Sequence, residues 1–214
     1  IRLVCRLKAS LTSKVLLLSI GLLLRLEANI MGNGKVFLEI GTCDFDTCLP
    51  LAEAGWSGYM VEADPRYAEI MANKTAQYDV QVDNMAVSNK NGTIAFNQSI
   101  QTDGWARGIG VVDDADHLGG SLLNHPANAH FLMDKIEVPC CRLDTYLIEN
   151  EIDHIDFMKI DVEGHEVNIL GVYSWKVKPT FVKIEHAHID AELIINILDK
   201  QGYMTWVEDI YGVV

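Results

Sequence analysis

The chain has 214 residues, of which 49% are hydrophobic and 22% charged. These proportions describe one folded domain with a sizeable buried core and exclude disorder over most of the length. The formal net charge of -13 and the pI near 4.8 argue against a nucleic-acid partner, because phosphate backbones are bound by clustered Lys and Arg. Small molecules and neutral glycans are compatible with such a composition.

The first 30 residues differ in charge from the rest. They carry five basic side chains and a single acid, and residues 15–24 are almost wholly apolar. Such a stretch is too short for the roughly 20 residues that span a bilayer. Three interpretations of residues 1–30 stay open: a leading helix packed on the domain, translated sequence upstream of a start at Met31, or a targeting or anchoring segment. Residues 31–214 form the predicted domain.

Five cysteines are present, at positions 5, 43, 48, 140 and 141, and none forms a C-x-x-C pair. An odd number without this spacing indicates neither a disulfide framework nor a zinc site. We therefore predict a reducing, cytoplasmic compartment and no bound metal. Residues 1–30 keep a membrane-anchored or secreted protein as an alternative, although no firm membrane association is expected.

From residue 35 the sequence alternates between strand and helix patterns. Short apolar runs bounded by polar residues predict strands at 36–40, 58–62 and 80–82. Helical patterns lie between them at 47–54 and 65–76, the second opened by a Pro at a favoured first-turn position. This alternation is typical of βαβ units and of a mostly parallel sheet flanked by helices.

A β-hairpin is predicted next, because Asn91-Gly92 separates strand patterns at 85–88 and 93–96. Residues 97–137 then break the rhythm and are rich in Gly. A long irregular segment within a domain is typical of a lid or binding loop, with a plain surface loop as the alternative. Regular patterns return with strands at 136–141, from Ile155, at 180–185 and at 204–207, and with helices capped by Asp144, from His165 and at 191–201.

The first strand of the predicted domain runs into a glycine turn, in the sequence Glu39-Ile40-Gly41-Thr42. Glu62 closes the next strand about 20 residues later, where nucleotide-binding α/β folds place an acid for the ribose. A carboxylate suits this position because it accepts hydrogen bonds from both hydroxyls of a vicinal diol. Glu62 is therefore predicted to bind the ribose of a nucleotide cofactor.

The charge around the glycine turn indicates which nucleotide is bound. A pyrophosphate requires bare amides in a G-x-G-x-x-G loop, whereas this loop has one Gly and is surrounded by Glu39, Asp44 and Asp46. These acids would repel NAD, but they suit the positive sulfonium and amino groups of S-adenosylmethionine. We predict S-adenosylmethionine as the cofactor, and an NAD-dependent oxidoreductase is a distant alternative.

Residues 159–166, Lys-Ile-Asp-Val-Glu-Gly-His-Glu, resemble the K-I-D-V-E-G-x-E signature of the FkbM family of S-adenosylmethionine-dependent methyltransferases. Residues 141–147 and 179–185 resemble two further family segments, and the resemblance covers roughly 36–185. It implies the Rossmann-like class I methyltransferase fold, with a seven-stranded sheet. Because the chain stops soon after the sixth predicted strand, we expect the antiparallel seventh strand to be short or missing.

The resemblance also implies site residues. It assigns Glu39 and Gly41 to the methionine end of the cofactor, and the adjacent Thr42 is a further candidate for cofactor binding. In this class of fold the turn after the third strand often contacts adenine, which makes Asn84 and Ala86 candidates; a simple hairpin turn is the alternative. Known members largely methylate hydroxyl oxygens of sugars or natural products, so the expected acceptor is a carbohydrate or small metabolite.

Methylation of a hydroxyl needs an acceptor held in line with the methyl carbon and is helped by a base that removes the proton. Asp161 and Glu185 close neighbouring predicted strands and His165 starts a helix, so these three are the candidate bases. A structural salt-bridge cluster with Lys159 or Lys183 is the alternative.

Phe45 replaces the later Gly of the family's first motif. We expect this side chain to pack in the core and leave the cofactor site open, because burying a Phe contributes roughly 1.5–3 kcal/mol. If it instead blocked the site, the protein would be a catalytically silent, methyltransferase-like binding protein.

Overall fold

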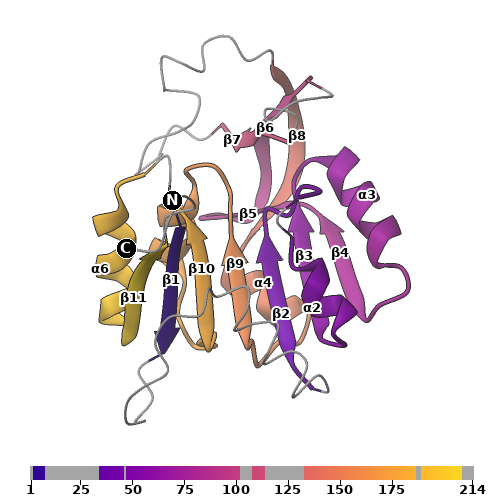
Figure 1. The fold of residues 1–214 in the computed structure, drawn as a ribbon. Helices are drawn as coiled ribbons and strands as arrows, with labels where there is room; N and C mark the ends of the chain where they lie inside the picture. The colour runs from indigo at the N-terminus through magenta and orange to yellow at the C-terminus, as the bar shows by residue number, and fades with distance from the viewer. Residues whose placement is uncertain are drawn as a thin grey trace.

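The computed structural model describes residues 2–7, 34–45, 47–101, 108–113, 133–186 and 189–208. Within these residues the chain forms a seven-stranded and a four-stranded sheet with flanking helices (Figure 1). The larger sheet has the spatial order β11 (Tyr203–Glu208), β1 (Arg2–Leu7), β10 (Phe181–Glu185), β9 (Phe157–Ile160), β2 (Val36–Ile40), β3 (Ser57–Glu62) and β4 (Val80–Asn84). The helices are α2 (Leu49–Glu53), α3 (Pro65–Thr75), α4 (Leu143–Glu149), α5 (Glu166–Val172) and α6 (Ala191–Lys200).

The middle of the larger sheet is parallel. Strands β10, β9, β2, β3 and β4 pair in parallel with their neighbours. All four residues of β9 and four of the five residues of β2 are buried, as expected of strands covered on both faces. The predicted α/β class, a mostly parallel sheet flanked by helices, is confirmed.

Strand β1 occupies the antiparallel position of this sheet. It lies between β10 and β11 and runs antiparallel to both, with Arg2 opposite Glu185 and Glu208 in the register. The expectation that the antiparallel strand would be short or missing was therefore wrong, because residues 2–7 supply it from the other end of the sequence. These residues form a strand, whereas residues 8–33 lie outside the described part of the chain.

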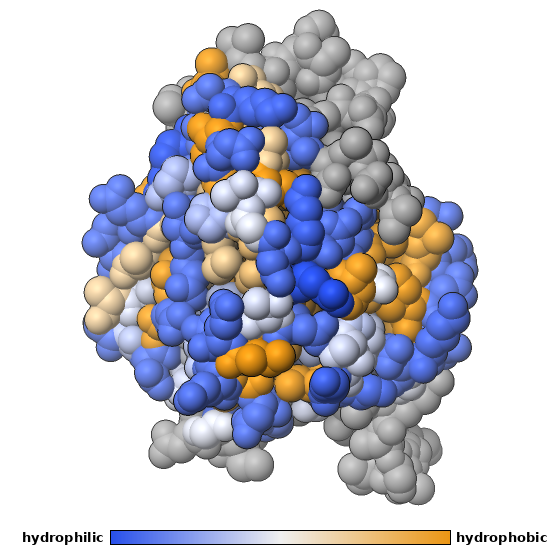
Figure 2. Space-filling model, turned by 180° about the vertical axis from the view of Figure 1, so that it is seen from behind, coloured by the Kyte–Doolittle hydropathy of each residue, from blue (hydrophilic) through white to orange (hydrophobic). Residues whose placement is uncertain are grey.

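Helices cover the two faces of the larger sheet (Figure 1). On one face α2 and α3 pack over Phe37 and Met60. On the other face α4, α5 and α6 pack over a larger core that contains Leu38, Ile160 and Ile184. Alternate residues of each strand thus enter different cores, as the pleat requires. Seen from behind, the molecule is mostly hydrophilic with separate hydrophobic patches (Figure 2).

The smaller sheet has the order β5 (Ala86–Ser88), β8 (Met133–Arg142), β6 (Gly92–Ser99) and β7 (Gly110–Val112). Strand β8 pairs with both β5 and β6. The predicted hairpin between residues 85–88 and 93–96 was therefore wrong. The Asn91-Gly92 turn does reverse the chain, with Gly92 at φ 124, but β8 lies between the two strands that the turn connects.

Two helix starts also differ from the prediction. Helix α2 begins at Leu49 instead of residue 47, and α4 begins after Arg142. Asp144 does not cap α4, because its carboxylate accepts the backbone amide of Ser174 at 3.0 Å. By contrast, Asp64 caps α3. Among the helices of the described ranges, none has the length and apolar composition needed to cross a bilayer.

Candidate functional site

The parallel strands β2, β3, β4, β9 and β10 end along one edge of the larger sheet, and the smaller sheet stands beyond that edge (Figure 1). In open α/β sheets, ligands bind outside this edge. The structure brings together here five of the residues predicted from the sequence, namely Gly41, Glu62, Asn84, Asp161 and Glu185. This edge is therefore the candidate functional site.

Gly41 begins the loop that follows β2, which we call the glycine loop (residues 41–48). Its φ is 77, and a Cβ at this position would lie 1.8 Å from the backbone oxygen of Asp161. The Gly41 amide donates to the Val61 carbonyl at 2.9 Å, and the Asp161 amide donates to the Ile40 carbonyl at 2.9 Å. Only glycine fits where these three chain segments meet.

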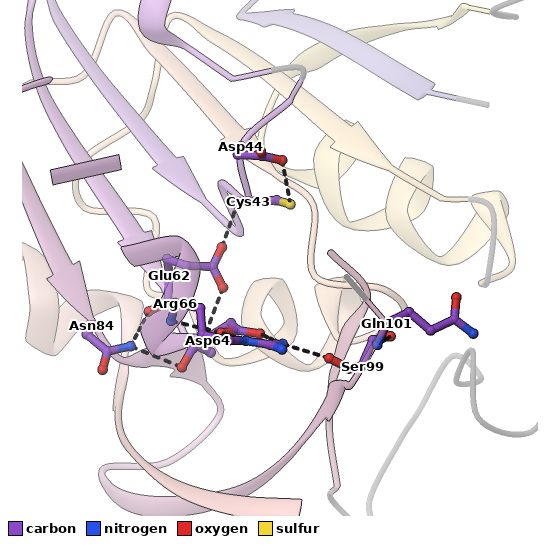
Figure 3. A network of polar contacts seen from close by, with 9 residues as sticks. Cys43, Asp44, Glu62, Asp64, Arg66, Asn84, Ser99 and Gln101 are labelled. Carbon is purple, nitrogen blue, oxygen red and sulfur yellow. Dashed lines mark hydrogen bonds and ion pairs between the residues drawn. The ribbon is translucent and has the colours of Figure 1, made fainter. Parts of the chain in front are cut away.

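Glu62 closes β3 and holds the glycine loop (Figure 3). Its Oε2 accepts the backbone amides of Thr42 at 2.9 Å and Cys43 at 2.7 Å, and its Oε1 accepts the amide of Asp64 at 2.8 Å. Burial raises the pKa of the Glu62 carboxyl, while the amides of Cys43 and Asp64 oppose that rise. The carboxylate thus determines where the loop lies against the sheet edge.

A second set of contacts ties this corner to the smaller sheet (Figure 3). The Arg66 guanidinium pairs with both oxygens of Asp64 and donates to the carbonyl of Ser99, the last residue of β6, at 2.7 Å. Asn84 donates its side-chain amide to the carbonyl of Glu62 at 2.9 Å. Arg66 was not singled out from the sequence, because its contact with β6 depends on how the two sheets are placed.

Glu39 lies beneath the glycine loop and is fully buried. One of its oxygens accepts the Thr42 hydroxyl at 3.0 Å and the Cys48 amide at 2.9 Å; the other lies 3.1 Å from the ammonium of Lys159. Thr42 itself is 1% exposed. The assignment of Glu39 to the methionine end of a cofactor, and of Thr42 to the cofactor site, stays a prediction. In the structure both residues shape the loop from inside.

Two other predicted residues are enclosed by the fold. Ala86, in β5, packs in the core of the smaller sheet with Ile94 and Phe96. His165 precedes α5 and is 0% exposed, with its Nε2 2.9 Å from the hydroxyl of Ser88. The contacts of Ala86 and His165 thus connect β5 with the rest of the domain.

Carboxylates gather at the tips of β9 and β10. Glu166, which sequence reasoning did not select, is fully buried and accepts the amides of Val162 at 2.9 Å and Gly164 at 3.0 Å. Burial raises the pKa of Glu166 well above its usual value, and the charges of Glu185 and Asp161 add to this rise. Within the described ranges no group of three His, Cys, Asp or Glu side chains is arranged to hold a metal ion.

Phe45 does not pack in the core, so that prediction was wrong. Its side chain is 50% exposed. Phe45 lies in the loop before α2, which begins at Leu49, so the helix does not hold its side chain against the sheet. Its ring lies beside Gly108, where a Cβ would be 3.3 Å from Phe45 Cε1 and 2.1 Å from Cys43 Sγ. Residues 102–107 and 114–132 of the predicted lid lie outside the described residues.

Comparison with known families agrees with this geometry. The model of the methyltransferase FkbM domain matches residues 32–204, a range that includes the glycine loop, Glu62 and both acidic strand tips. Comparisons with curated proteins and with solved structures gave no match. The mostly parallel sheet with flanking helices is the class I methyltransferase-like fold of this family. The chain therefore belongs to the FkbM methyltransferase family.

Proposed function

We propose that the protein transfers the methyl group of S-adenosylmethionine to a hydroxyl oxygen of a carbohydrate or another small metabolite. The observation that carries the proposal is the meeting of the Gly41 turn, the Glu62 carboxylate and Asp161 at one sheet edge. The end of β2 supplies a glycine that lets a ligand approach the backbone, and the end of β3 supplies an acid for a ribose. The end of β9 supplies a further acid beside them.

The residues present fit this cofactor in their chemistry. A carboxylate oxygen accepts about two hydrogen bonds. Glu62 Oε2 already accepts two amides, whereas from the described residues Oε1 accepts that of Asp64 alone, so one position on Oε1 is proposed for a ribose hydroxyl. Asp44 and Asp161 leave the edge acidic, which favours a cationic ligand over a pyrophosphate.

When bound, S-adenosylmethionine supplies a methyl carbon that is activated by its positive sulfur. The chain must then hold the acceptor hydroxyl in line and accept its proton. Asp161 suits this task because its side chain is 22% exposed and is fixed by Lys159 at 3.4 Å. Glu185 closes the neighbouring strand and is the second candidate. His165 is enclosed and its ring contacts Ser88 of β5, so we assign it a structural role.

Cofactor binding is tested by calorimetry with S-adenosylhomocysteine and with NAD. We expect the wild-type protein to bind S-adenosylhomocysteine and not NAD. Glu62→Gln should lose about 1.5–3 kcal/mol of binding free energy, the value of hydrogen bonds to a charged group. Glu69→Gln is the matched control, because Glu69 is exposed on α3. Binding of NAD alone would reject the proposal.

Catalysis is tested by screening glycans and small hydroxyl compounds for methyl transfer. On any acceptor found, Asp161→Asn and Glu185→Gln should lower turnover by about 10²–10⁴-fold with smaller effects on cofactor affinity. Tight binding of S-adenosylhomocysteine without transfer to any acceptor would favour the alternative of a catalytically silent binding protein. Full activity of both variants would show that neither carboxylate acts as a base, so that positioning of the acceptor alone explains the catalysis.

A further inference from the structure

Three neighbouring strands place charged residues in one row across the larger sheet. Glu39 of β2 is opposite Lys159 of β9, and Lys159 is opposite Lys183 of β10. Two residues after these lysines stand Asp161, which directly follows β9, and Glu185, which ends β10. Glu185 shares the face of Lys183 by alternation, and Asp161 contacts Lys159 at 3.4 Å. Lys159 is therefore the middle residue of a row of three charged side chains, and this row lies next to the candidate site.

Lys159 contacts the site on two sides. Its ammonium lies 3.1 Å from Glu39 Oε1 and 3.4 Å from Asp161 Oδ2. The other oxygen of Glu39 accepts the Thr42 hydroxyl and the Cys48 amide. Through Glu39 the ammonium is thus connected to both ends of the glycine loop, and through Asp161 to the tip of β9.

This ion pair is enclosed by the protein, with side-chain exposures of 4% for Lys159 and 0% for Glu39. Burial raises the pKa of the Glu39 carboxyl, and the charge of Lys159 opposes that rise. A buried pair contributes little net stability, because desolvation of both charges offsets their attraction, and apolar replacements of both are often neutral. The arrangement therefore points to a task other than stabilising the fold.

We infer that Lys159 is a positioning residue: its ammonium holds Glu39, and with it the glycine loop, in a fixed place relative to Asp161. The inference rests on the proposed function in that the loop binds the methyl donor and Asp161 faces the acceptor. Removal of the ammonium leaves two carboxylates without their common counter-charge. The position of the glycine loop relative to Asp161 is then no longer fixed.

The first test uses the protein without ligand. Hydrogen exchange of the segment 39–49 is compared in wild type, Lys159→Met and Lys183→Met, the last being the matched control from the next strand of the same row. Lys159→Met should speed exchange in this segment by at least about tenfold, and Lys183→Met should leave it unchanged. Equal exchange in all three proteins would overturn the inference.

A double variant separates positioning from folding. Glu39→Gln together with Lys159→Met removes both buried charges, so the midpoint of thermal unfolding should return towards the wild-type value. Exchange in segment 39–49 should nevertheless stay fast, because the ammonium that fixes the side chain at position 39 is absent, although a Gln oxygen can still accept from Thr42 and Cys48. Recovery of slow exchange in the double variant would show that the pair serves the fold alone, against the inference.

The second test measures the affinity for S-adenosylhomocysteine. Lys159→Met should weaken binding by at least about tenfold, whereas Lys183→Met should bind like the wild type. Unchanged affinity of Lys159→Met in a protein whose wild type binds would overturn the inference. If the wild type binds no S-adenosylhomocysteine, the proposed function fails, and the exchange experiment still decides the role of Lys159.

Discussion

The contact between Gly108 and Cys43 makes a precise prediction about how the smaller sheet meets the glycine loop. A Cβ added to Gly108 would lie 2.1 Å from Cys43 Sγ, well inside van der Waals contact. Gly108→Ala should therefore destabilise the protein by about 1–3 kcal/mol, as overpacking does. In a Cys43→Ala background the nearest atoms would be Phe45 Cε1 at 3.3 Å and the Cβ of residue 43 at 3.5 Å. Most of the cost should then disappear.

The assay is urea unfolding of the wild type, the two single variants and the double variant. The coupling free energy between the two positions should reach about 0.5–3 kcal/mol, with the double variant more stable than the sum of the single effects predicts. Gly110→Ala serves as the control, because its Cβ would meet Phe96 at 2.1 Å instead. Gly110→Ala should lower the free energy of unfolding equally in the wild type and in the Cys43→Ala variant. An equal cost of Gly108→Ala with and without the sulfur would refute the reasoning.

Three further predictions concern single residues. Gly41→Ala should lower the free energy of unfolding by more than about 3 kcal/mol, from the left-handed backbone and the clash with Asp161, whereas Gly171→Ala, with open space around it, should be neutral or stabilising. Lys35, Val36 and a nearby His lower the pKa of the Asp156 carboxyl although burial opposes them. Its stabilising effect is thus present above about pH 4 and lost as pH falls through the lowered pKa, so the stability difference between wild type and Asp156→Asn should shrink between about pH 5 and pH 2. Phe45→Ala should cost less than about 1.5 kcal/mol in chemical denaturation, because the side chain is half exposed; a loss of about 3–5 kcal/mol would show that it is buried after all.

The parallel part of the fold could be predicted from the sequence, because its signals are local. Each of β2, β3 and β9 is a short apolar run with a Gly or an acid at or directly after its end, and Pro65 marks the start of α3. Pairing between distant segments could not be predicted in this way. The turn at Asn91-Gly92 was visible, but the partner of both flanking strands, β8, lies some 50 residues further on in the chain.

The same distinction holds for the candidate site. Gly41, Glu62 and Asp161 were placed at one edge because each follows a strand pattern, and parallel strands end together. The contact of Lys159 with Glu39 depends on the register between β2 and β9, and the contact of Glu166 with Val162 depends on the path of a turn. Neither can be derived from spacing. Phe45 was misplaced because its ring lies beside Gly108, a contact between segments distant in the sequence that spacing does not reveal.

The place of β1 has a consequence for synthesis of the protein. Its two partners, β10 and β11, are among the last described segments to leave the ribosome, so β1 must wait unpaired until nearly the whole domain has been made. Pairing of such distant segments is slow, and open strand edges invite association with other chains. Deletion of residues 2–7 would leave β10 and β11 without the strand that lies between them. Expression vectors that start near Met31 are therefore at risk of insoluble product.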